Sequence, residues 1–198
     1  FNTVLETSDH GSFNSWGRDR FWMANNKRTE NRVEADRSTI FLDFLGPTII
    51  RNNRMRCDHG WDIDLDDGSS YYHLYNNLCL KNGIKLREGY HRRVENNICI
   101  NNAMHPHVWL KNNNDIIRGN IFGNRFFPIL VDYWGKEIDY NWYMSQADLL
   151  EVQKLGLDKN SMSGDPMFVD PENGDFTVKP GSPVFALGWN NIPMDKFG

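Results

Sequence analysis

Short apolar stretches recur along the middle of the chain, and each one surrounds a pair of asparagines or a weakened form of that pair. They occupy residues 50–55, 74–79, 94–99, 117–122 and 138–143. The last asparagine of the motif advances by 24, 20, 23 and 21 residues from one copy to the next. A period near 22 residues without a helical pattern predicts a solenoid of short strands, in which each coil stacks on the one before it.

A second recurrence predicts how the coils align. Residues 62–68 align with 83–89, and the next coils supply 107–112 and 128–133. Apolar and polar residues alternate in these segments, which predicts strands with one buried face. The two predicted inward columns are Ile63, Ile84, Val108 and Ile129, followed by Leu65, Leu86, Leu110 and Val131.

The asparagine column has a structural interpretation, because stacked amides can form hydrogen bonds from coil to coil. The predicted ladder contains Asn53, Asn77, Asn97 and Asn120. Cys79 and Cys99 follow the ladder by two residues, so we expect buried thiols stacked in one inward column. Glu95 shares an outward column with Arg51, Tyr75 and Arg118, which favours a ladder of ion pairs.

Three segments depart from the repeat. Residues 16–47 are too long for one corner and predict a loop excursion that forms one wall of a groove. Residues 145–157 predict a short helix capped by Ser145. Residues 158–198 predict closing strands and a tail that protect the edge of the last coil. We therefore expect one all-β domain over 1–198, with about five to seven coils. The chain opens in mid-pattern without Met, so we expect the C-terminal part of a longer solenoid.

Composition narrows the functional classes. The net charge of −4 gives no basic footprint for nucleic acid. No apolar run approaches the roughly 20 residues of a membrane span. Neither a glycine-rich phosphate loop nor a serine elbow is present, which argues against nucleotide and acyl-transfer chemistry. Seven Trp and seven Tyr leave rings available for stacking on sugars.

The asparagine-paired coils, together with Asp165-Pro166, Gly174-Asp175-Phe176 and Pro180-Gly181-Ser182-Pro183, resemble secreted bacterial right-handed parallel β-helix proteins of the pectate-lyase-like superfamily. Residues 10–22 also resemble part of such an enzyme. Many members are glycoside hydrolases or polysaccharide lyases. The resemblance implies a right-handed parallel β-helix, a secreted, periplasmic or cell-surface location, and a poly- or oligosaccharide substrate.

The densest group of charged side chains predicts where chemistry occurs. Asp62, Asp64 and Asp66 alternate with inward residues, so we expect them on one outer face beside Lys85 and Arg87. Glycoside hydrolysis requires one protonated carboxyl group and one carboxylate. We predict Asp64 with Glu88 or Asp66 as the catalytic pair, with no cofactor. The structural alternative is that Asp64–Lys85 and Asp66–Arg87 are ladder salt bridges on a solvated face.

The side chains around this face are predicted to bind the sugar, with Trp109 stacked against it. The predicted substrate-binding set is Asp62, Lys85, Arg87, His10, Trp16, Arg18, His107, Trp109 and Lys111.

Two other functions remain open at this point. In a polysaccharide lyase, Asp62, Asp64, Asp66 and Asp67 would bind Ca²⁺ while Lys85, Arg87 or Lys111 removes a proton beside a uronate. The other function is that of a non-catalytic glycan-binding or fibre module.

Overall fold

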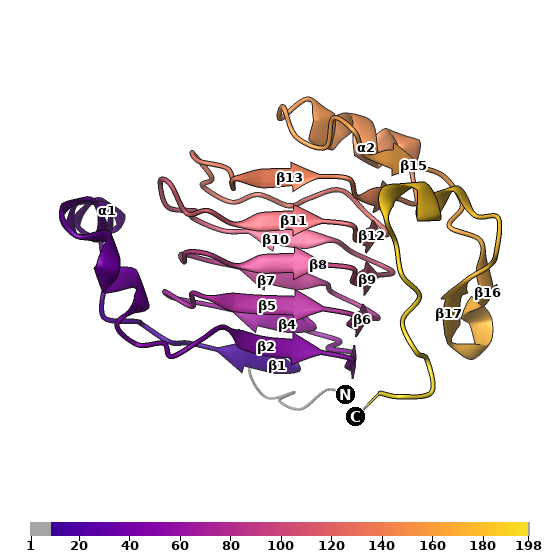
Figure 1. Ribbon diagram of the computed structural model, residues 1–198, viewed down its shortest axis with the longest axis horizontal. Helices are drawn as coiled ribbons and strands as arrows, with labels where there is room; N and C mark the ends of the chain where they lie inside the picture. The colour runs from indigo at the N-terminus through magenta and orange to yellow at the C-terminus, as the bar shows by residue number, and fades with distance from the viewer. Residues whose placement is uncertain (1–8, 198) are drawn as a thin grey trace.

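The computed structural model describes residues 9–197 and contains a parallel β-solenoid of about six turns (Figure 1). Three sheets run along it. Sheet A contains β1 (Phe13–Ser15), β4 (Ile63–Leu65), β7 (Ile84–Leu86) and β10 (Met104–Pro106). Sheet B contains β2 (Thr48–Arg51), β5 (Tyr72–Tyr75), β8 (Arg93–Glu95), β11 (Ile116–Arg118) and β13 (Glu137–Asp139). Sheet C contains β3 (Arg54–Met55), β6 (Leu78–Cys79), β9 (Ile98–Cys99), β12 (Ile121–Phe122), β14 (Trp142–Tyr143) and β15 (Met162–Ser163). The predicted fold class is confirmed.

The asparagine ladder is also confirmed. The side-chain amide of Asn77 donates to Asn97 Oδ1 at 3.0 Å, Asn97 donates to Asn120, and Asn120 donates to Asn141, each also at 3.0 Å. The first residue of each pair turns the chain in the left-handed region, as at Asn96 with φ 54°. The two asparagines of a pair therefore have separate tasks, the first in the backbone turn and the second in the ladder.

Two further predicted columns are present, the cysteine column and the outward column of Glu95. Cys79 and Cys99 pair in register as buried free thiols. Arg118 Nε donates to Glu95 Oε1 at 2.8 Å, which confirms the outward ion pairs.

The predicted register is correct for two coils and wrong for the third. Ile63 pairs with Ile84, as expected, but the next partner is Met104 rather than Val108. The prediction slipped by four residues, because the apolar run that ends in Leu110 belongs to the corner after β10. Val108 has a φ of 53°, which ends the extended strand there. The slip misplaced Ile129 too, since its side chain is exposed.

The excursion over residues 16–47 leaves the solenoid between β1 and β2 and contains α1 (Asn26–Ala35) and the 3-10 helix η1 (Arg37–Phe41). It lies at the far left of Figure 1, beside the ends of the coils. Phe21, Val33 and Ile40 are buried against Tyr90 and Leu110 of the coils, so the excursion is anchored by its own small core. Asn25 caps α1 through its side chain, which accepts from Arg28 N.

The end of the chain covers the solenoid differently from the prediction. Helix α2 (Gln146–Gln153), capped by Ser145 as expected, places Leu149 and Val152 in the main core. Strands β16 (Phe168–Asp170) and β17 (Asp175–Val178) form an antiparallel hairpin with the 3-10 helix η2 (Pro171–Asn173) between them, and η3 (Pro183–Leu187) follows.

The hairpin packs on the outer face of sheet C instead of on the last coil's edge, contrary to the prediction. The outward residues of that sheet are apolar, so they need a cover: Leu78, Ile98, Ile121 and Trp142. No helix within residues 9–197 combines the length and hydrophobicity of a membrane span.

Candidate active site

A buried lysine lies at the centre of the charged face of sheet A. Lys85 is 2% exposed, and its Nζ lies 3.2 Å from both Asp64 Oδ1 and Asp66 Oδ1. The ammonium also lies 4.3 Å from the centre of the Trp61 ring. The predicted Asp64–Lys85 register is therefore correct, but the face is not solvated. Enclosure strengthens each ion pair and raises the cost of removing one partner.

Asp64 has no exposed surface, so its carboxyl group does not reach a pocket in this structure. Burial raises the pKa of Asp64 to about 6, while Lys85 opposes the rise and the neighbouring Asp66 adds to it. The prediction that Asp64 is the central catalytic carboxyl is not supported by this position. Its contacts make it a structural partner of Lys85.

Asp62 has a different role from the predicted one. Its carboxylate accepts from the backbone N–H of Cys57 at 2.7 Å and from those of Lys81, Asn82 and Gly83 at 3.0 Å each. Burial raises the pKa of Asp62, and these backbone donors oppose the rise. The side chain thus holds a corner between two coils and points away from any ligand.

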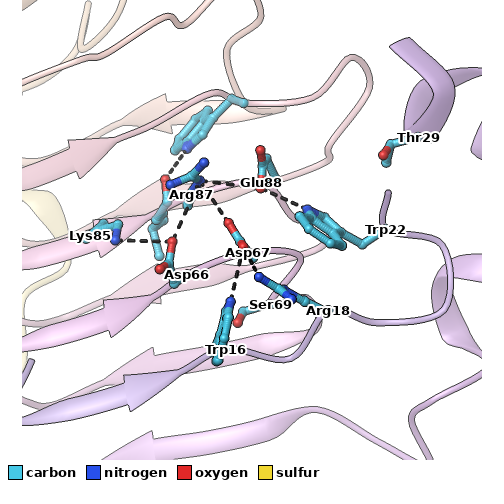
Figure 2. Close-up of polar contacts among 12 residues, drawn as sticks. Trp16, Arg18, Trp22, Thr29, Asp66, Asp67, Ser69, Lys85, Arg87 and Glu88 are labelled. Atoms are coloured by element: carbon cyan, nitrogen blue, oxygen red, sulfur yellow. Dashed lines mark hydrogen bonds and ion pairs between the residues drawn. The ribbon is translucent and has the colours of Figure 1, made fainter. Parts of the chain in front are cut away.

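Asp67 and Glu88 share one guanidinium at the rim of sheet A. Arg87 Nε lies 3.1 Å from Asp67 Oδ1 and 3.5 Å from Glu88 Oε2 (Figure 2). Arg87 also lies 3.7 Å from Asp66, which confirms the predicted neighbours. The arrangement places two carboxyl groups from adjacent coils beside a single positive charge.

The two carboxyl groups have different environments. Asp67 Oδ2 accepts from Trp16 Nε1 at 3.1 Å and from Arg18 Nη2 at 3.4 Å, so donors and cations surround its ionised form. Burial raises the pKa of Glu88, although a 2.9 Å hydrogen bond from Trp22 Nε1 and the charge of Arg87 oppose the rise. Two neighbouring carboxyl groups with such different surroundings are typical of acid and base pairs.

These groups line an open pocket of about 650 Å³. The coils contribute one wall, formed by Asp67, Arg87, Glu88, Val108 and Leu130. The excursion contributes the other, formed by Arg18, Trp22, Ala24, Asn25, Asn26 and Lys27. The excursion thus forms one wall of this pocket. Asp67 and Glu88 therefore lie where a ligand has access.

Other predicted binding residues lie around this pocket. Trp16 is 60% exposed, and the guanidinium of Arg18 lies 4.2 Å from the centre of its ring. His107 lies in the coil after that of Arg87, and its Nε2 is buried with no hydrogen-bond partner in the described part of the chain. Burial, with Lys85 and Arg87 nearby, lowers the pKa of His107 to about 4.

Three predicted binding residues lie elsewhere. Trp109 is buried in the core, where its Nε1 donates to Leu86 O, so it does not stack on a ligand. Lys111 pairs with Glu34 of α1 at 3.0 Å and fastens the excursion to the coils. His10 is exposed, and its carbonyl oxygen lies beside Cys57.

Sequence reasoning missed two aromatic neighbours of the site. His105 pairs with Lys85, the position that the shifted register had given to Trp109. Trp22 lies inside the excursion, where no repeat indicates which way its side chain points. The segment around Trp16 and Arg18 offered the available signal, since Trp22 belongs to the same cluster of rings and charges.

A parallel solenoid with an open, charged pocket between its coils and a loop excursion defines the class of this protein as a β-helix protein. The comparisons agree with this class. A family model described as periplasmic copper-binding protein (NosD) matches residues 3–149, so the chain belongs to the NosD family. No curated protein and no solved structure matches the chain. The family description is periplasmic, which agrees with the predicted periplasmic location.

The described residues do not fit a copper centre. Copper sites in proteins are built from imidazole, thiolate and thioether ligands. Within residues 9–197, the one group of three converging donors is Asp9, Asp64 and Asp66, all carboxylates, and the Lys85 ammonium lies among them. Cys57 Sγ and His59 Nδ1 approach to 3.8 Å without a third such ligand in that part of the chain.

The four aspartates of the predicted calcium site do not converge either. Asp62 is occupied by backbone amides, and Asp67 by Trp16, Arg18 and Arg87.

Proposed function

We propose that the protein is a carbohydrate-active enzyme that hydrolyses glycosidic bonds in the pocket between sheet A and the excursion. The observation that carries the proposal is the pair Asp67 and Glu88, two carboxyl groups that share Arg87 and have opposite surroundings. One protonated carboxyl group and one carboxylate beside the same bond are what glycoside hydrolysis requires.

In this proposal Glu88 is the acid. Its raised pKa keeps a proton available for the oxygen of the leaving sugar. Asp67 is the nucleophile, because Arg18, Arg87 and the Trp16 indole stabilise its charge. Asp67 attacks the anomeric carbon as the bond to the leaving oxygen breaks and Glu88 transfers its proton. Ionised Glu88 then takes a proton from water, which displaces Asp67 and restores both groups.

The geometry favours retention of configuration. The two oxygens that contact Arg87 Nε lie at 3.1 and 3.5 Å from it, so their separation cannot exceed the sum of those distances. Retaining enzymes hold their carboxyl groups about 5–5.5 Å apart, and inverting enzymes about 6.5–9.5 Å. Trp16, at the edge of the pair, offers an exposed ring on which a sugar can stack.

The test replaces each carboxyl group by its amide and uses two kinds of substrate. Glu88→Gln should lower the hydrolysis of natural glycans about 10²–10⁴-fold. On nitrophenyl glycosides it should release a burst of nitrophenolate, because that leaving group departs without a proton, and then turn over slowly, because the second step lacks its base. Asp67→Asn should lose activity on both substrates. Glu151→Gln is the matched control, since Glu151 is an exposed glutamate on α2 that pairs with Lys154.

Circular dichroism and thermal unfolding identify variants that fail to fold. Full activity of both amide variants would refute the assignment. An unsaturated uronate product, with loss of activity in a chelator, would indicate a lyase. Binding without turnover across a broad glycan panel would indicate a non-catalytic module.

A further inference from the structure

A second groove lies on another flank of the solenoid, between sheet C and the hairpin β16–β17. Its volume is about 740 Å³, and its apolar floor is formed by Leu80, Ile100 and Phe176. Of the remaining lining residues, Arg54 lies in β3, and the others follow β3, β6 and β9 or belong to the hairpin turn. Since neighbouring coils lie about 4.8 Å apart, a ligand along this groove would cross three coils over about 10 Å.

Arg54 is the residue that the packing of this flank does not explain. It pairs in register with Leu78 and continues an outward column that is otherwise apolar, next to Ile98. An apolar side chain would fill that place under the hairpin. The Nε of Arg54 is instead buried, with no hydrogen-bond partner among residues 9–197. The side chain as a whole is partly exposed and lines the groove, and leaving this N–H unpaired is costly, so it is a donor that a bound oxyanion would satisfy.

The hairpin turn holds this guanidinium in place. Gly174 has a φ of 86°, and a Cβ built on it would meet Arg54 Nη2 at only 2.5 Å. The glycine therefore allows the turn to lie directly on the guanidinium. The contact orders a long side chain in advance, which lowers the entropy that a ligand would have to remove.

The charge around the groove favours an anion. Arg54, Arg56 and Lys81 face one acidic lining residue, Glu172. Arg56 is paired with Asp58 at 2.8 Å. Among residues 9–197, neither Arg54 nor Lys81 has a carboxylate within ion-pair distance. Two cations thus remain available beside the apolar floor.

We propose that this groove binds an acidic oligosaccharide, whose carboxylate or sulfate groups engage Arg54 and Lys81 while its sugar rings cover Leu80 and Ile100. The sugar part rests on the proposed function, and the oxyanion part rests on the groove alone. The groove would then hold a substrate chain at a distance from Asp67 and Glu88. Guanidinium groups suit this task because they bind carboxylate and sulfate with paired hydrogen bonds.

The experiment measures binding in the Glu88→Gln chain by calorimetry with three hexasaccharides: a hexagalacturonate, a sulfated heparin fragment and cellohexaose. We expect one acidic chain to bind and cellohexaose not to bind. Adding Arg54→Gln should weaken that binding about tenfold or more. Adding Lys81→Gln, at an exposed position, should weaken it in the same direction and guards against misfolding of the Arg54 variant. Arg32→Gln removes an equal charge from exposed α1 and should leave affinity unchanged.

The two acidic probes distinguish carboxylate from sulfate as the recognised group. Binding of neither acidic chain, equal binding of cellohexaose, or unchanged affinity in both groove variants would overturn the proposal. An equal loss of affinity in Arg32→Gln would mean that only the net charge of the protein matters, and this result would also overturn the proposal. The result is separable from the proposed function, because affinity at the groove does not depend on whether Glu88→Gln abolishes turnover.

Discussion

Replacing Arg92 by Met tests whether a buried ion pair holds the wall of the pocket. Arg92 and Asp115 are both fully buried, and Arg92 Nε and Nη2 bind Asp115 Oδ2 at 3.0 and 2.5 Å. Arg92 Nη1 also donates to the carbonyl oxygen of Arg87, the residue between the two proposed catalytic carboxyl groups. Methionine keeps much of the volume and removes all three donors.

The expected loss of stability follows from the buried Asp115 carboxylate, which the substitution leaves without its cation. Asp115 would keep its bond from the Arg92 backbone N–H at 2.8 Å but lose its opposite charge. Removing one partner of a buried pair costs about 3–5 kcal/mol. Burial already raises the pKa of Asp115 against the influence of Arg92, and the substitution would raise that pKa further. The loss should therefore be full at neutral pH and smaller in acid, where Asp115 becomes neutral.

Urea unfolding followed by fluorescence at pH 7 and pH 4.5 measures both effects. Arg118→Met is the matched control, since Arg118 is about half exposed and its pair with Glu95 should contribute only about 0–1 kcal/mol. The reasoning fails if Arg92→Met and Arg118→Met lose the same free energy of unfolding, or if the loss in Arg92→Met grows as the pH falls.

Two further predictions concern the acid and the ladder. Glu88 must be protonated to act, so kcat/KM should fall as the pH rises through its pKa. Trp22→Phe removes a hydrogen bond that lowers this pKa, so the alkaline limb of the pH profile should move to higher pH. A shift of that limb to lower pH would contradict the assignment. Asn97→Leu removes the side-chain hydrogen bonds to Asn77, Asn120 and Leu74 O in the middle of the ladder, and it should lower the free energy of unfolding in urea by about 3–5 kcal/mol. This loss should be several times that of Asn53→Leu at the part-buried end, and equal losses would argue against coupling between coils.

The sequence predicted those parts of the fold that repeat. The asparagine period gives the coil length, and strict alternation around Ile63 and Ile84 gives their shared column. Both signals are local and recur, so neighbouring coils confirm one another. The third coil lacked this support. The apolar run ending in Leu110 alternates as a strand does, but it packs as a corner after β10, and single-chain periodicity does not distinguish the two.

The site was predicted in part, and the error had a physical cause. Arg87, Glu88, Trp16 and Arg18 meet at the pocket because adjacent coils and the excursion bring them there. Alternation indicates which aspartates leave the core, and it predicts that these side chains are exposed. Lys85 and backbone amides enclose Asp64 and Asp62 instead. Whether an outward side chain reaches solvent depends on what covers it, and no periodic pattern contains that information.

The excursion, rather than the repeat, gives the two proposed catalytic carboxyl groups different surroundings. Repeating coils alone would place Asp67 and Glu88 in similar surroundings beside Arg87. Residues of the excursion change these surroundings: Trp16 and Arg18 donate hydrogen bonds to Asp67, whereas Trp22 donates one to Glu88 (Figure 2). The small core around Phe21 and Tyr90 fixes that loop on the coils. Chemistry in this protein therefore depends on a non-repeating segment whose position the solenoid determines.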